Sequence, residues 1–210
     1  MGNGSGVSRA MFALGVPAAM AADAVLFALL RRARPQPFGL SSPPVYPAMF
    51  RSAGQGQPGR FSSVVLSYGR PLTSDGQLIE VETCFAEPDC FLPALEETIT
   101  RAELRDRAWA RRDWTAEPSV FAPVPGVHVP AGGFQRDEHV VVVAGQERQV
   151  PVTRHQGCEA LRFAHDSKVV TVVARLGFPD RPQFELVNDL EPYLAEHRRS
   201  ILSWLRFWEQ

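Results

Sequence analysis

"RHQGCEALRFAHD", residues 154–166, decides how the C-terminal half of the chain is interpreted. It places two histidines, a cysteine and an aspartate close together, as a metal or catalytic cluster would, or as a strand between two turns would. If "CEALRFA" is a strand, His155 and His165 lie roughly 30 Å apart, at about 3.3 Å per residue. Ligands of one zinc ion must each approach within about 2.0–2.3 Å of it. We therefore predict a strand flanked by turns.

The neighbouring segments extend this strand into a meander. Four segments rich in β-branched residues are joined by the short polar connectors "GQE", "HQG" and "HDS", which suit hairpins: "HVVVVA" (139–144), "RQVPVTR" (148–154), "CEALRFA" (158–164) and "KVVTVVARL" (168–176). Valines on both faces of the last segment predict a central strand covered on both sides.

Upstream of the meander, residues 60–69 and 77–85 also have strand composition. Residues 92–112, and residues 189–210 downstream of the meander, repeat apolar residues at helical spacing. Residues 117–133, broken by prolines, are expected to form an edge strand and a loop. The order predicts an α+β fold: an antiparallel sheet of about six strands, ending in a four-strand meander, with packed helices. This order loosely resembles the PsbP-like α/β sandwich over about 150 residues, in topology alone, so no functional residue is carried over.

The N-terminal part divides into two segments. Residues 10–30 are apolar except for Asp23, and three arginines follow them. Their length is close to the roughly 20 residues that cross a bilayer, so a buried helix, a membrane anchor and a signal peptide all remain open. Residues 35–60, rich in proline and glycine, predict a linker or wrapping segment. We expect the divisions 1–34, 35–60 and 61–210.

Composition restricts the possible partners and cofactors. Lys+Arg (22) and Asp+Glu (23) balance to a net charge of -1, which does not favour nucleic-acid binding. "GQGQPG" (54–59) matches GxGxxG but follows prolines and would open a strand, so no dinucleotide cofactor is expected. The three cysteines predict reduced thiols and a cytoplasmic location, although a Cys84–Cys90 bridge stays open.

Two residue pairs are candidates for catalysis. Glu80 and Glu82 share one strand face, roughly 7 Å apart, as acid–base carboxylates can, but a solvent-exposed strand face has the same pattern. His155 and Cys158 can meet across the "HQG" turn as a nucleophile pair. Two ligands do not complete a metal site, and no metal is expected.

The C-terminal aromatic residues Trp204, Phe207 and Trp208 are the candidate partner surface, for a protein or a second copy of the chain, or else pack on the chain's own sheet. The sequence thus favours a non-enzymatic bacterial binding or interaction protein of adaptor, chaperone-like or immunity type. The alternatives are a hydrolase-like enzyme that uses Glu80 and Glu82 with a histidine, and a cytoplasmic domain tethered to the membrane through residues 10–30.

Overall fold

The computed structural model describes residues 21–41, 48–55, 61–69, 77–85, 92–111, 120–121 and 126–208. The chain divides into two units, Met1–Pro35 and Gln36–Gln210. In the first unit residues 21–33 form a helix. Residues 10–20 of the apolar segment lie outside the described residues. In the part of the chain that is described, no helix has the length and apolar character needed to cross a membrane.

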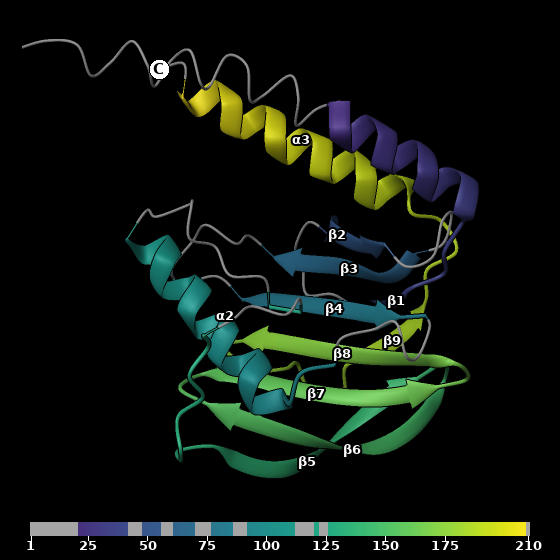
Figure 1. Cartoon of the computed structure of the whole chain (residues 1–210). Coiled ribbons are helices and arrows are strands. Elements are labelled where there is room, and N and C mark those ends of the chain that lie inside the picture. The colour runs from purple at the N-terminus through teal and green to yellow at the C-terminus, as the bar shows by residue number, and fades with distance from the viewer. Residues whose placement is uncertain are drawn as a thin grey trace, which may run out of the picture. The chain divides into compact units, whose positions relative to one another are not determined.

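In the second unit, nine strands of the described residues form one sheet in the order β1-β9-β5-β6-β7-β8-β4-β3-β2 (Figure 1). All neighbours are antiparallel except β5 and β9, which are parallel. The elements are β1 (Phe38–Leu40), β2 (Ala48–Gln55), β3 (Phe61–Gly69), β4 (Leu78–Cys84), α2 (Leu95–Ala110), β5 (Gln135–Val143), β6 (Gln146–His155), β7 (Cys158–His165), β8 (Lys168–Arg175), β9 (Gln183–Leu186) and α3 (Glu191–Trp208).

The predicted meander is confirmed as β5 to β8, and its turns follow from the sequence. Gln156 and Gly157, between β6 and β7, have φ values of 45° and 84°. Positive φ at both central residues is the type I′ turn, whose twist matches that of antiparallel strands. His155 ends β6 and His165 ends β7, so β7 separates the two imidazoles as predicted.

The sheet curls until β1 meets β4, on the far side of the sheet from α2 (Figure 1). Hydroxyl side chains join β1 to β4 and to β3. Phe38 N–H donates to Thr83 Oγ1 of β4 at 2.8 Å, and Leu40 N–H donates to the Tyr68 hydroxyl of β3 at 2.9 Å. We call this junction the hydroxyl seam. It satisfies amides of β1 that a neighbouring strand would otherwise have to pair.

Each face of the central strands packs against a different core. Inside the curl, the Phe163 ring lies 5.9 Å from that of Phe38 and 5.2 Å from that of Phe184. On the other face, Ile99 and Ala102 of α2 belong to a buried cluster with residues of β3, β7 and β8. The expectation that residues 168–176 form a central strand covered on both sides is therefore confirmed in β8.

The predicted C-terminal helix is confirmed as α3, which packs along β2 (Figure 1). His197 donates through Nδ1 to the Phe50 carbonyl at 2.8 Å, and the hydroxyls of Tyr193 and Tyr68 lie 3.3 Å apart. β2 is the last strand of the sheet among the described residues. The imidazole of His197 on α3 hydrogen-bonds a backbone carbonyl of this strand.

Two expectations about the fold are wrong, the strand count and the PsbP-like topology. The sheet has nine strands in the described residues, not about six, and its topology differs from that of the PsbP-like sandwich. Residues 35–60, expected as a linker or wrapping segment, supply β1 and β2. Residues 126–133 of the expected edge-strand region contain no strand, and most of residues 117–125 lie outside the described residues.

Candidate functional site

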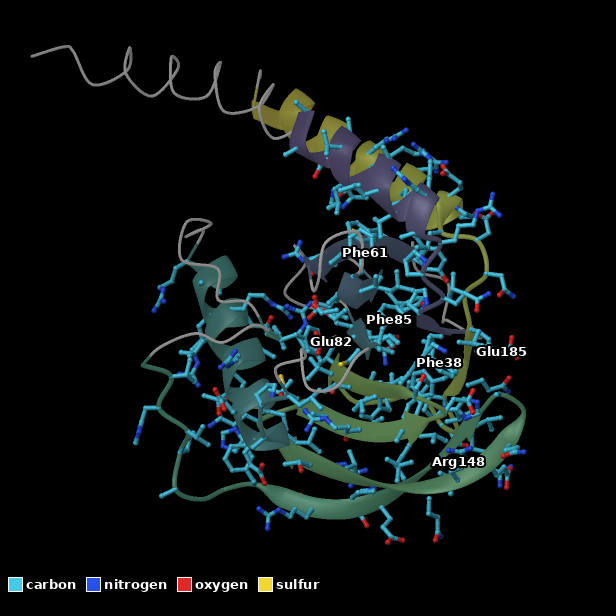
Figure 2. The ribbon with its side chains drawn as sticks, turned by 45° about the vertical axis from the view of Figure 1, so that its right-hand side comes forward. Phe38, Phe61, Glu82, Phe85, Arg148 and Glu185 are labelled. Atoms are coloured by element: carbon cyan, nitrogen blue, oxygen red, sulfur yellow. The ribbon has the colours of Figure 1, made fainter. Side chains whose placement is uncertain are left out.

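Charged side chains occupy the face of the sheet that α2 covers, and we call this group the polar layer. Glu82 of β4 pairs in register with Thr171 of β8, which pairs with Arg162 of β7. Because strand side chains alternate between faces, Glu80 lies on the same side as Glu82. Figure 2 shows Glu82 on the α2 side of the sheet and Phe38 on the opposite side.

The interpretation of this strand face as solvent-exposed is wrong. Glu80 is 2% exposed and Glu82 is 5% exposed. The side chains of β4 alternate as predicted, but α2 lies over the polar face of β4, and sequence periodicity does not report what covers a sheet. Both carboxyls therefore lie in the interior of the fold.

Glu80 is paired with α2. Its Oε2 accepts a hydrogen bond from Arg105 Nη1 at 2.5 Å, and both side chains are almost fully buried. Burial lowers the pKa of the Arg51 guanidinium on β2, and the negative charge of Glu80 opposes that shift. A buried carboxylate held by arginine is an anchor between sheet and helix, because removing either partner leaves an uncompensated charge.

Asp106 of α2 lies next to this pair, between two arginines. Its carboxylate oxygens are 4.0 Å from Arg105 Nε and 3.8 Å from Arg175 Nη1 of β8. Burial raises the pKa of Asp106, and the two arginines partly offset that rise. The polar layer thus links α2 to both β4 and β8 through charges.

Glu82, like Asp106, has one buried carboxylate oxygen that makes no hydrogen bond. The carboxyl is hydrogen-bonded by the Ser63 side chain of β3, yet its Oε2 is buried and makes no hydrogen bond. Burial raises the pKa of Glu82 to about 7, against the opposing effects of Ser63 and of the positive charge of Arg162. The side chain therefore changes charge close to neutral pH.

Arg162 is oriented by groups other than Glu82. Its Nε donates to Thr171 Oγ1 at 2.9 Å, and its Nη2 donates to the Pro93 carbonyl at 2.7 Å, just before α2. Burial lowers the pKa of Arg162, and Glu82 opposes that change. Arg162 thus fixes the start of α2 and influences Glu82 as a charge two strands away, across β8.

His155 and Cys158 are a directly opposed pair between β6 and β7, so their predicted proximity is confirmed. His155 donates through Nδ1 to Glu103 Oε1 of α2 at 2.6 Å, and its ring lies 4.6 Å from that of Phe134. Burial raises the pKa of the Cys158 thiol to about 12, and Asp106 and Glu103 add to the rise. A thiol that stays protonated is a poor nucleophile.

The other histidines lie elsewhere. His128 is exposed, His139 donates through Nε2 to the Pro179 carbonyl at 3.4 Å, and His165 Nδ1 accepts from Arg148 Nη2 at 3.2 Å. Among the described residues, no group of three or more His, Cys, Asp or Glu side chains could hold a metal ion. The polar layer thus consists of hydrogen bonds and ion pairs that join the sheet to α2.

The structure departs from the expectation that all three cysteines are reduced thiols. Cys84, at the end of β4, is disulfide-bonded, whereas Cys158 is a free, buried thiol. The expectation is therefore wrong for Cys84 and confirmed for Cys158. Cys90 lies outside the described residues.

The C-terminal aromatic residues and the GxGxxG match lie largely outside the part of the chain that the structure describes. Trp204, Phe207 and Trp208 lie within α3, and their side chains are not among those described. Of the GxGxxG match, Gly54 belongs to β2, while Gly56 and Gly59 lie outside the described residues.

Sequence reasoning missed the partners that complete the polar layer. Arg162 is a single polar residue inside a strand that is otherwise apolar on that face, Thr171 lies between two valines of its strand face, and Arg105 and Glu103 lie among the buried positions of α2. A polar residue within a buried strand is a usable signal, because such groups need partners. Which of these side chains pair with one another depends on how four elements are aligned in the fold, and the sequence pattern does not give that alignment.

Comparison with protein-family models finds no match, and comparisons with curated proteins and with solved structures find none either.

Proposed function

We propose that the chain is a non-enzymatic binding or interaction protein, of the adaptor, chaperone-like or immunity type. One observation carries this proposal: the side chains that catalysis would need are already paired inside the fold. Glu80 is bonded to Arg105, and His155 is bonded to Glu103. Groups committed to internal partners stabilise the docking of α2 and are not available to a substrate.

The proposed binding surface is the C-terminal end of α3. The first turns of this helix are held to the sheet through Tyr193, Leu194 and His197. The helix continues beyond them to Trp208, and Phe207 lies about 100° around a 3.6-residue helix from Trp208. Aromatic side chains supply much of the energy at protein interfaces, so a protein or a second copy of the chain is the expected partner.

The test compares Trp208→Ala and Phe207→Ala with Arg199→Ala, an exposed α3 residue paired only locally with Glu196. Light scattering of the full chain over a concentration series measures self-association, and immobilised full chain measures binding of purified candidate partners. An aromatic substitution should weaken association at least about 30-fold, as loss of an interface hot spot does. Equal association by all three variants would refute this surface.

A second function, a hydrolase-like enzyme, is favoured by Glu82 alone. A carboxyl with a pKa of about 7 is matched to general acid–base catalysis near neutral pH. Full-length chain would be assayed on ester, phosphoester and glycoside substrates, with Glu82→Gln beside Glu147→Gln, an exposed carboxyl. Activity with a pH limb near 7 that only Glu82→Gln removes would replace the binding proposal with this one.

A membrane-tethered domain remains a third possibility. It is tested by fractionating cells that produce the full chain or a chain starting at Pro35. Tethering through residues 10–30 requires that the shorter chain leave the membrane fraction. The cytoplasmic location expected from the sequence stays a prediction, and the disulfide at Cys84 is evidence against it.

A further inference from the structure

The half-cystine Cys84 lies at a protected place in the fold. It is the last residue of β4, between β3 and β8 in the sheet, and it is 1% exposed. Disulfides that serve as redox switches are typically strained or exposed, so that an external thiolate can reach a sulfur atom. The burial of Cys84 is instead typical of a permanent structural crosslink.

The free thiol of Cys158 is kept away from this disulfide. Cys84 pairs in register with Val169 of β8, and Cys158 pairs with Arg175 at the other end of the same strand. Six residues of strand separate the two positions, roughly 20 Å at about 3.3 Å per residue. Direct attack by the Cys158 sulfur is therefore excluded by distance.

Chemistry protects the crosslink as well. Thiol–disulfide exchange requires a thiolate, and burial raises the pKa of Cys158 to about 12. An odd thiol in a disulfide-bonded protein commonly causes exchange or intermolecular pairing. Here that thiol is buried, protonated and distant, an arrangement suited to a chain that meets oxidants.

We propose that this domain matures in an oxidising compartment, where Cys84 and a second cysteine of the same chain are crosslinked by a disulfide-bearing oxidoreductase. One thiolate of the chain attacks the donor disulfide to form a mixed disulfide, and the second thiolate then displaces the donor. The chain loses two electrons and two protons, and the donor leaves as a dithiol. This inference is independent of the proposed function, because a binding protein and a hydrolase could both require it.

The first experiment counts thiols in the full chain. Cells that produce it are quenched in acid, and the denatured protein is labelled with a maleimide polymer before or after reduction. One label before reduction and three after it are expected, with the protein migrating as a monomer on a non-reducing gel. Cys158→Ser should give none and two. Three labels before reduction, or a disulfide-linked dimer, would overturn the proposal.

The second experiment locates the oxidised form. The same labelling is applied to cell fractions, and to cells that lack the thiol-oxidising pathway. The one-label form should be found outside the cytoplasmic fraction, and it should become a three-label form when the pathway is absent. A one-label form in the cytoplasm, or one that persists without the pathway, contradicts the proposal.

A stability measurement tests whether the crosslink is structural. Reduction of the wild-type chain should lower its Tm by roughly 5–15 °C, the effect of losing a native disulfide in a domain of this size. Cys84→Ser should have the lower Tm already and show no further response to reductant. A wild-type Tm that reduction leaves unchanged would show that the bond has no structural role, against the proposal.

Discussion

At the scale of single residues, the polar layer contains a carboxylate paired with arginine, Glu80, and a carboxyl that is only partly satisfied, Glu82. Arg105 stabilises the charge of Glu80, whereas Glu82 has Ser63 on one oxygen and no hydrogen bond on the other. A buried carboxyl without sufficient partners takes up a proton instead of remaining charged. Glu82 therefore changes its protonation state close to neutral pH.

Glu82 makes the stability of the fold depend on pH. Its pKa rises from 4.5 to about 7 on folding, so between these values the folded chain binds more protons than the unfolded chain. The contribution of protonated Glu82 to the free energy of unfolding is complete below about pH 4.5 and is lost as pH rises through 7. This change amounts to about 3 kcal/mol. Glu82→Gln should remove this dependence and be the more stable protein at pH 8. Urea unfolding between pH 4.5 and 8 measures it.

The matched control is Glu147→Gln, because Glu147 is an exposed carboxyl paired with Arg181. This variant should keep the wild-type pH dependence. Parallel stability curves for the wild type and Glu82→Gln would mean that Glu82 is ionised in the fold throughout this range.

The Glu80–Arg105 pair predicts strong coupling between two residues. Arg105→Leu should cost about 3 kcal/mol, because it leaves a carboxylate buried without its main partner. Combining it with Glu80→Leu should restore most of that loss, since no isolated charge remains. Chemical unfolding of the four proteins of the double-mutant cycle measures the coupling, and additive losses would contradict the pairing. Arg181→Ala, at an exposed pair, should change stability by no more than about 1 kcal/mol.

At the scale of elements, what the sequence predicts depends on length and pattern. β5 to β8, β3, β4, α2 and α3 are long and periodic, and all were predicted. β1 has three residues, β9 has four, and β2 contains glycine and register shifts, so these strands have weak local signals. Their pairing with partner strands, and not their local propensity, decides that they are strands.

The candidate site was predicted only in part, for a related reason. Alternation placed Glu80 and Glu82 on one face, and the turn at Gln156 and Gly157 brought His155 close to Cys158. Which helix covers that face depends on long-range packing, which a strand pattern does not encode. The internal partners of these residues could therefore not be named beforehand.

The open edge of β5 predicts a self-association phenotype. Among the described residues, β9 pairs with β5 only at Val142 and Val143, and the amides of Val142 and Ala144 point to that edge. By the two-residue period of a strand, the Glu138 amide points there too, and it donates to Asp137 Oδ1 at 2.8 Å. That bond holds the pKa of Asp137 low, with help from Arg154. Asp137→Ala should therefore expose a pairing amide.

Sedimentation over a concentration series checks this expectation. Asp137→Ala should form larger species at concentrations where the wild type does not change its association state. Glu138→Ala, which removes a neighbouring exposed charge but keeps the hydrogen-bond acceptor, is the control. Equal sedimentation of the two variants would mean that charge, and not the Asp137 hydrogen bond, protects the edge.

At the scale of the whole molecule, the hydroxyl seam closes the curl. Thr83→Val removes the acceptor of the Phe38 amide while keeping the shape of a fully buried side chain. The loss should be about 1–3 kcal/mol, the usual penalty for a buried donor left unsatisfied, and the Phe38 amide should exchange faster with solvent. Ser41→Ala, at an exposed hydrogen bond, should change stability by less than about 0.5 kcal/mol. Unchanged exchange at Phe38 in Thr83→Val would contradict the seam.

The same junction sets the order in which the folded chain comes apart. Among the described residues, neighbouring strands of the sheet are joined by backbone pairing, whereas β1 meets β3 and β4 through one threonine and one tyrosine hydroxyl. Separation at this line breaks these two side-chain hydrogen bonds and leaves the ladders of the meander intact. The earliest opening of the molecule should therefore admit water to the phenylalanine rings behind β1 while α2 is still in place.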